Sequence, residues 1–301
     1  MLRKPATTVT TISARSNKHA FFVLCSALAL VTGGGPALAQ DAQRGLYVSK
    51  AGGCVGCHTE AKPGAQPYAG GRALKTPFGT FFGPNITPHP RAGIGRWSEG
   101  DFIRAMRLGV RPDGAHYFPA FPYTSFTKIT DADLKDLWAY LRRLPPSGRA
   151  SPPHELKFYV RWRLPLWGWK WLFFSPGAFV PDPAISATLN RGAYLVQALG
   201  HCGECHTPRN WLGAPKKGRF LAGAKLTEGA KAPNLTPTRL KKMSDAEIKD
   251  ILRTGMTAEG EVLSEAMAEV VENTTSQLEP QDLDALIAYL RSLPPLPEEP
   301  R

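Results

Sequence analysis

Cys54-Val55-Gly56-Cys57-His58 occurs a second time in the chain as Cys202-Gly203-Glu204-Cys205-His206, and these two motifs decide its organisation. Two cysteines with two residues between them and a histidine directly after are the attachment pattern of c-type haem. One turn of backbone brings both thiols to the two vinyl groups, and the imidazole faces the iron. The motifs therefore predict two covalent haem c groups, bound through Cys54, Cys57, Cys202 and Cys205, with His58 and His206 as proximal iron ligands.

Zinc is the main alternative, because paired CxxC elements also bind it. A zinc site needs four ligands that converge on one ion, and it leaves the histidine after each motif unexplained. A thioredoxin-like redox pair would need a βαβ setting, which the sequence lacks. The fifth cysteine, Cys25, lies in the apolar N-terminal segment, so the two motifs account for all the others.

Residues 1–39 have the layout of a secretory signal peptide, with a basic start, an apolar core and the small-residue cleavage site Ala37-Leu38-Ala39. The apolar core is shorter than the ~20 residues that span a bilayer, so we expect cleavage rather than an uncleaved anchor. The mature protein is expected in the periplasm, beginning at Gln40. Its moderate positive charge favours an acidic redox partner. Scattered basic residues without a recognition motif argue against nucleic acid.

Three further stretches occur twice at nearly constant spacing. They are Arg44-Gly45-Leu46-Tyr47 with Arg191-Gly192-Ala193-Tyr194, Pro84-Asn85-Ile86-Thr87-Pro88 with Pro233-Asn234-Leu235-Thr236-Pro237, and Leu141-Arg142-Arg143-Leu144-Pro145-Pro146 with Leu290-Arg291-Ser292-Leu293-Pro294-Pro295. The repeat predicts two tandem domains with one haem each. We place them at residues 40–146 and 184–296, with a connector at 147–183 and a short tail at 297–301.

The predicted fold class is all-α, with helices separated by loops rich in glycine and proline. Ser98 and Ser244 begin capping-box patterns, which predict helix starts. A closing helix in each domain has one apolar face and ends at the double proline. The faces are Leu134, Leu137, Trp138 and Leu141 in the first domain and Leu283, Leu286, Ile287 and Leu290 in the second. Haem would supply apolar core that such small domains lack.

The connector holds four of the seven tryptophans, all within residues 161–174 and interleaved with cations. This pattern suits a membrane interface or a partner surface. Because prolines interrupt any long amphipathic helix there, we expect instead a connector that packs across both domains and buries its rings. Peripheral membrane contact through residues 161–174 is the alternative.

The sixth ligand of each iron decides its chemistry, since His/Met ligation raises the reduction potential and an open site permits substrate binding. In the second domain we predict Met267, in a loop just ahead of the closing helix. Met256 is the alternative ligand and is expected in the core.

In the first domain, Phe121 holds the position that we match to Met267, and phenylalanine cannot coordinate iron. Met106 lies on an apolar helical face and is expected in the core. We predict His116 as the sixth ligand, which gives bis-histidine ligation and a lower potential than the second haem. An empty or water-bound iron and ligation by His89 are the alternatives.

Several polar residues near the motifs are candidates to bond the haem propionates. They are Asn85, Thr87, Asn234 and Thr236 in the repeated Pro-Asn-x-Thr-Pro stretches, and Arg72, Lys225 and Trp97 in nearby loops. The alternative is that the Asn and Pro residues serve turn geometry alone.

With these motifs, the chain resembles the diheme cytochrome c family related to the cytochrome c subunits of membrane-bound alcohol and gluconate dehydrogenases. The matching stretches are both haem motifs, Pro84-Asn85-Ile86-Thr87-Pro88, Trp97-Ser98-Glu99 and Phe118-Pro119-Ala120-Phe121-Pro122-Tyr123. The resemblance implies class I cytochrome c folds, a periplasmic location and electron transfer from a dehydrogenase toward quinone or a terminal oxidase. Met267 matches the family's ligand position. Two departures are the usual third haem domain, which this chain lacks, and Phe121 in place of the usual methionine.

The leading functional hypothesis is an electron carrier, or an electron-transfer subunit, whose partners are a periplasmic dehydrogenase, other cytochromes or a terminal oxidase. No nucleophile, acid/base pair or substrate motif stands out besides the haem motifs, and an electron carrier needs none. The alternative is a peroxidase-like diheme enzyme with its chemistry at the first haem, which Phe121 motivates. A third hypothesis makes the aromatic connector an adaptor to a membrane or to another subunit.

Overall fold

In the computed structural model, residues 40–226 and 229–298 are described, and the predicted signal peptide and last three residues lie outside them. The first repeat contains α1 (Ala42–Ala51), α2 (Cys54–His58), β1 (Ala73–Thr76), β2 (Gly79–Phe82), α3 (Glu99–Leu108), α4 (Tyr123–Phe126) and α5 (Asp131–Leu141). The connector contains β3 (Glu155–Leu156), η1 (Phe158–Val160) and α6 (Leu164–Phe173). The second repeat contains α7 (Ala187–Tyr194), η2 (Leu195–Leu199), α8 (Gly203–His206), η3 (Lys217–Arg219), β4 (Ala224–Lys225), β5 (Lys231–Ala232), α9 (Pro237–Leu240), α10 (Asp245–Thr254), α11 (Glu265–Asn273), η5 (Thr275–Gln277) and α12 (Pro280–Ser292). Within these ranges, no helix is long and apolar enough to cross a bilayer.

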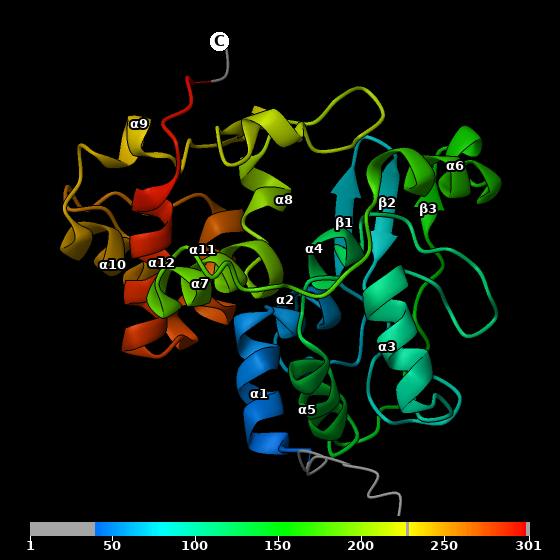
Figure 1. Cartoon of the computed structure of the whole chain (residues 1–301). Coiled ribbons are helices and arrows are strands. Elements are labelled where there is room, and N and C mark those ends of the chain that lie inside the picture. Colours follow the sequence, from blue (N-terminus) through cyan, green and yellow to red (C-terminus); the bar gives the residue numbers. More distant parts are fainter. Residues whose placement is uncertain (1–39, 227–228, 299–301) are drawn as a thin grey trace, which may run out of the picture. The chain divides into compact units, whose positions relative to one another are not determined.

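Each repeat is built on a pair of crossed helices, α1 with α5 and α7 with α12 (Figure 1). The crossing requires the glycine of each repeated Arg-Gly-x-Tyr stretch. A Cβ on Gly45 would lie 1.9 Å from the carbonyl oxygen of Asp136, and one on Gly192 would lie 2.0 Å from that of Ala285. Only a residue without a side chain lets the helix backbones approach so closely.

The predicted helix starts and closing helices are confirmed. Ser98 and Ser244 each form a capping box with the acidic residue three positions later, Asp101 and Glu247, at the start of α3 and α10. The predicted apolar residues of α5 and α12 are all buried. One apolar cluster includes them and continues from the first repeat into the second, where η2 contacts α1 and α4.

Short strands add to the predicted all-α class. β1, β2 and β3 form an antiparallel sheet, and β4 pairs with β5. Because β3 belongs to residues 147–183, part of the connector is hydrogen-bonded into the sheet of the first repeat. The strands have two to four residues, too few for a period-two pattern to stand out in the sequence.

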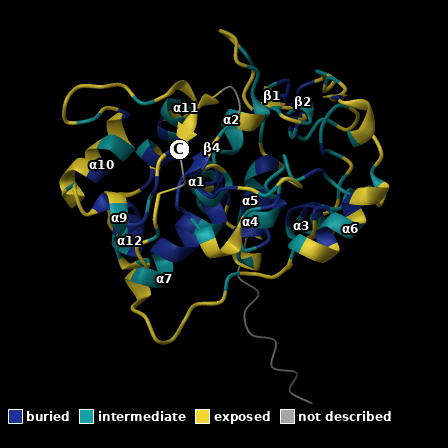
Figure 2. Ribbon diagram, turned by 90° about the horizontal axis from the view of Figure 1, so that it is seen from above, coloured by how far each residue is buried: buried dark blue, intermediate teal, exposed yellow. Residues whose placement is uncertain are grey.

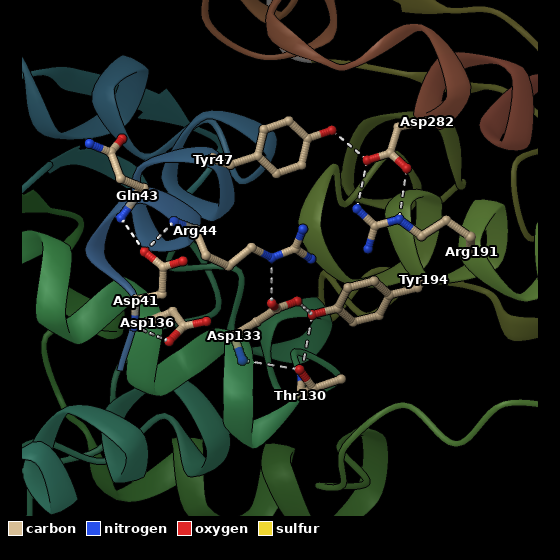
Figure 3. Close-up of polar contacts among 10 residues, drawn as sticks. All are labelled: Asp41, Gln43, Arg44, Tyr47, Thr130, Asp133, Asp136, Arg191, Tyr194 and Asp282. Carbon is tan, nitrogen blue, oxygen red and sulfur yellow. Dashed lines mark hydrogen bonds and ion pairs between the residues drawn. The ribbon is translucent and has the colours of Figure 1, made fainter. Parts of the chain in front are cut away.

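The two repeats exchange equivalent contacts at their junction (Figure 3). Tyr47 of α1 donates its hydroxyl hydrogen bond to Asp282 of α12, while Tyr194 of α7 donates to Asp133 of α5 at 2.6 Å. Each carboxylate also receives an arginine of its own repeat. Arg191 bonds both oxygens of Asp282 at 2.8 and 2.6 Å, and Arg44 bonds Asp133 at 3.2 Å. The repeated tyrosine therefore joins the two halves.

The expectation that the connector buries its rings is wrong. Trp162, Trp167 and Trp171 are 77, 65 and 77 % exposed, and Figure 2 shows α6 at the edge of the molecule with a largely exposed surface. Prolines do not prevent a helix here, because Pro165 lies in its first turn, where no backbone N–H is needed.

Candidate haem sites

Both motif histidines have the geometry of a proximal haem ligand. Nδ1 of His58 lies 2.7 Å from the carbonyl oxygen of Pro84, and Nδ1 of His206 lies 2.7 Å from that of Pro233. A carbonyl only accepts, so each Nδ1 carries the proton and each Nε2 keeps its lone pair for a metal. Burial lowers the pKa of both imidazoles, which favours this neutral form.

The repeated Pro-Asn-x-Thr-Pro stretches hold those two carbonyls in place. Asn85 Oδ1 accepts from Thr87 N and Oγ1 at 2.9 and 2.7 Å, and Asn234 Oδ1 accepts from Thr236 N and Oγ1 at 2.7 Å each. The amide groups of both asparagines donate to the chain after the closing helices, at Ser147, Arg149 and Leu296. These contacts are the kind that turn geometry requires. Propionate bonds from the four residues stay a prediction that none of these contacts supports.

A cavity of about 490 Å³ opens beside the first motif. This volume lies within the range of small-molecule and cofactor sites. Cys54, Cys57 and His58 line it, together with side chains that are mostly apolar or aromatic, among them Leu74, Phe81, Ile94, Trp97, Phe102, Met106, Phe118, Phe121, Phe126 and Leu137. A flat porphyrin with an iron needs this combination of an apolar slot, two thiols and one imidazole, so the residues present fit haem c.

The thiols themselves do not fit the alternatives. All four motif cysteines are free, without disulfide bonds. Burial raises the pKa of Cys54 to about 11 and that of Cys202 to about 12. Across residues 40–226 and 229–298, no group of three or more His, Cys, Asp or Glu side chains could hold a metal ion. The zinc alternative therefore lacks its converging ligands.

The sixth ligand of the first haem stays a prediction. His116 is outside the cavity lining, but its Nδ1 is buried and has no hydrogen-bond partner in the described structure, which fits a nitrogen reserved for another contact. His89 uses its Nδ1 locally, accepting from the backbone of Arg91 and Ala92. Met106 is buried, as expected.

The match of Phe121 to Met267 stays a prediction, because the position depends on where the repeats are aligned. Met267 lies 15 residues before Asp282, and Phe118 lies 15 residues before the equivalent Asp133. Counted from the paired carboxylates, Phe118 matches Met267. Two equivalent hydrogen bonds closer to Met267, from Tyr117 N to Gly109 O and from Leu263 N to Gly255 O, lie 146 residues apart and match Phe121 instead. Both phenylalanines line the first cavity, so neither correspondence supplies a ligand to iron.

Met267 lies in α11 and not in the predicted loop, and its side chain is half-buried. Met256, expected in the core, is 46 % exposed. The assignment of Met267 as ligand to the second haem stays a prediction. Residues 264–268 carry no strong sequence pattern, whereas the helix is fixed by packing of α11 on neighbours that include α2 and α10.

The two motifs are held together by contacts between the repeats. Arg72 pairs with Glu269 of α11 at 2.6 Å, and α11 packs on α2. Burial raises the pKa of Cys57, Arg72 lowers it, and the charges of Glu269 and Cys205 raise it. Arg72 remains only a candidate for a propionate contact, as do Trp97, which lines the cavity, and Lys225, which is exposed in β4.

Two residues of this junction were missed from the sequence. Glu204, inside the second motif, accepts from Thr124 and Ser125 of α4 at 2.7 and 2.8 Å. His201, just before Cys202, lines the first cavity and lies against the ring of Phe126 at 5.3 Å between centroids. From sequence, His201 is an ordinary surface or packing residue. Its left-handed backbone, with φ of 39°, is unusual for a residue with a side chain.

Comparison with known proteins decides the family. The cytochrome c family model matches the chain twice, over residues 34–145 and 189–294. The chain belongs to the cytochrome c family. A "diheme cytochrome c-type" protein of Cereibacter sphaeroides is 44 % identical over 85 % of this chain and 87 % of its own length. Family membership and this relative support haem c binding at the two motifs.

Other relatives of this cytochrome c are parts of dehydrogenases. The fructose dehydrogenase cytochrome subunit of Gluconobacter japonicus is 40 % identical over 83 % of this chain and 52 % of its own length. A subunit of the nicotinate dehydrogenase of Pseudomonas putida is 44 % identical over 83 % of this chain, but the match covers 21 % of that protein. The chain thus spans about half of the first of these two relatives and about a fifth of the second.

Proposed function

We propose that this cytochrome c is a periplasmic diheme electron-transfer protein that passes electrons from a dehydrogenase, or another donor, toward the respiratory chain. Each repeat would be a class I cytochrome c domain with one covalent haem. When bound, haem c supplies an iron that alternates between Fe(II) and Fe(III). The relatives that are cytochrome subunits of dehydrogenases support a dehydrogenase as the partner.

One observation carries the proposal: two attachment motifs with the same proximal geometry are joined by direct contacts between the repeats. His58 and His206 are fixed by equivalent carbonyls, and the first site is connected to the second motif through Glu204 and His201. An arrangement in which two redox sites share an interface suits transfer from one to the other within a single chain.

The rest of the chain orients and insulates the sites. Asn85 and Asn234 keep the carbonyls that fix the histidine tautomers, and the apolar lining of the first cavity excludes water. A low local dielectric raises the cost of the ferric charge and so raises the reduction potential. Four of the basic residues leave with the predicted signal peptide, so the mature chain has 33 basic and 25 acidic residues. This positive charge would steer an acidic partner toward the protein.

Electronic spectroscopy with a redox titration tests this function. We expect two low-spin haems, one with the charge-transfer band of methionine ligation and one without, that titrate at different potentials. In a rapid-mixing experiment with a reductant, reduction of one haem followed by electron transfer to the other would support transfer between the sites. A protein in which only one haem is reducible would contradict the proposal.

A peroxidase-like enzyme with chemistry at the first haem is the second candidate. Phe118 and Phe121 favour it, because both residues that could match Met267 are phenylalanines lining the first cavity. An iron without a sixth protein ligand is open to small molecules. A high-spin ferric first haem that reacts rapidly with peroxide would favour the enzyme over the carrier.

A further inference from the structure

The connector carries an exposed apolar surface that the electron-transfer proposal leaves unused. Its members are Trp162, Leu164, Trp167, Trp171 and Leu172, which we call the tryptophan surface, and the exposed Trp211 of the second repeat lies on a loop attached to the connector. Leu164 and Trp211 are 86 and 87 % exposed. Contiguous exposed apolar area of this kind marks a site of interaction with a protein or a membrane.

The helix α6 is anchored so that this face is directed outward. Lys170 is buried, and its Nζ donates to the carbonyl oxygens of Leu108 and Gly109 at 2.7 Å each, at the end of α3. Leu166, one turn earlier, is also buried. Leu164, Trp167 and Trp171 follow each other at spacings of three and four residues, so they form one exposed stripe along the helix.

A hydrogen bond links the connector to the loop of the second repeat that carries Trp211. The indole Nε1 of Trp169 donates to the carbonyl oxygen of Leu212 at 3.0 Å. This bond holds the loop with Trp211 against α6. Trp211, which is 87 % exposed, therefore lies on a loop that is attached to the connector helix.

The chemistry of the surface favours lipid over protein. The chain has no acidic residue from Leu156 to Pro181, and it carries Lys157, Arg161, Arg163 and Lys170 there. Residues 161–174 contain no Ser, Thr, Asn or Gln. Protein interfaces carry about one hydrogen bond per 100–200 Å² and have a polar rim. This surface has few side chains that could form such hydrogen bonds or such a rim. Tryptophans interleaved with cations are typical of segments that lie in the headgroup region of a bilayer.

We propose that the tryptophan surface docks this cytochrome c on an anionic lipid bilayer, with the indole rings in the headgroup region and Lys157 and Arg161 facing lipid phosphates. Arg163 and Phe118 line the first cavity, and the Arg163 guanidinium lies 4.7 Å from the ring centroid of Phe118. Docking through α6 therefore holds the first haem site near the lipid surface.

Vesicle flotation of the mature holoprotein tests this proposal. The probes are vesicles of phosphatidylcholine mixed with phosphatidylglycerol, and vesicles of phosphatidylcholine alone. We expect flotation with the anionic vesicles, weaker flotation with the neutral ones, and loss of the difference at high salt. Trp171→Glu should weaken partitioning about tenfold, because it removes an exposed ring and adds a repelled charge.

Val262→Glu is the matched control, since Val262 is 73 % exposed in the second repeat, outside the tryptophan surface. It adds the same charge and should leave flotation unchanged. The haem spectrum should match the parent in both variants, which separates lipid docking from haem binding. Flotation of Trp171→Glu equal to the parent would overturn the proposal. So would failure of the parent to float with either vesicle, or a Trp171-dependent dimer in place of lipid binding, which would assign the surface to a protein partner.

Discussion

The glycine at each helix crossing gives the sharpest test of how this sequence builds its fold. Gly45→Ala adds one methyl group at a point where a Cβ would lie 1.9 Å from Asp136 O and 2.5 Å from Asp136 C. The obstacle is backbone, so no side-chain rotation can relieve the clash, and α1 must move away from α5.

The expected cost follows from two opposed terms. Overpacking a tight contact costs about 1–3 kcal/mol or more, and a contact this short against backbone belongs at the upper end. Alanine gains about 1 kcal/mol over glycine in helix propensity. We therefore expect a net loss of about 2 kcal/mol in the free energy of unfolding. For a chain of this size, that is a fall in Tm of about 4–8 °C.

Thermal unfolding of the holoprotein, followed by far-ultraviolet circular dichroism and by the Soret band, measures this loss. Gly192→Ala should behave alike, because its Cβ would lie 2.0 Å from Ala285 O. Gly218→Ala is the control, since a Cβ at Gly218 meets nothing within 4 Å. If Gly45→Ala is as stable as the parent, the crossing does not depend on close backbone approach and the reasoning is refuted.

Three further predictions concern the haem ligands and the junction. Met267→Ala should abolish the methionine charge-transfer band and lower one reduction potential in a spectroelectrochemical titration. Met256→Ala, at an exposed position, should change neither. The reverse pattern would make Met256 the ligand. His116→Ala should convert the first haem to high spin in electron paramagnetic resonance, with His89→Ala unchanged, and a parent-like spectrum in both would indicate an iron that is already open. Asp282→Asn should lower the free energy of unfolding by about 1–3 kcal/mol in urea at neutral pH, because Tyr47 and Arg191 lose their charged partner. Asp284→Asn, at an exposed position on the same helix, should lower it little. Burial raises the pKa of Asp282, but the bonds from Arg191 and Tyr47 outweigh it and leave the pKa below the ordinary value. The stability that the Asp282 charge contributes is therefore complete above the unfolded pKa of about 3.9, and it is lost as the pH falls through the folded pKa. The difference in unfolding free energy between parent and Asp282→Asn should therefore vanish in acid. A difference that stays constant with pH would show that Asp282 acts by shape and not by charge.

Local sequence rules predicted the parts of this fold that local physics determines. The capping boxes at Ser98 and Ser244 satisfy backbone groups within one turn, and the faces of α5 and α12 follow a helical period, so both can be predicted without knowing the rest of the chain. The haem motif is equally local, since both thiols and the imidazole come from five consecutive residues.

Contacts between distant segments were beyond these rules. Nothing near Tyr47 in the sequence indicates that its hydroxyl bonds Asp282, and the glycine of Arg-Gly-x-Tyr gains its meaning only when α1 meets α5. The repeat itself carried a usable clue: equivalent residues in two similar domains can exchange partners, as Tyr47 and Tyr194 do. The exposure of Trp162, Trp167 and Trp171 was mispredicted because aromatic composition is the same in a buried connector and in a docking surface. What decides between them is the anchoring of Lys170 on the end of α3.

The central claim is that this cytochrome c carries two covalent haem groups, one at each motif. The intact mass of the mature protein, produced in a host that attaches haem c and measured under denaturing conditions, tests it most directly. We predict the mass of the polypeptide from Gln40 plus two haem groups, falling by one haem in a Cys202→Ala/Cys205→Ala variant. A bare polypeptide mass, or a chain that binds zinc in place of iron, would contradict the account.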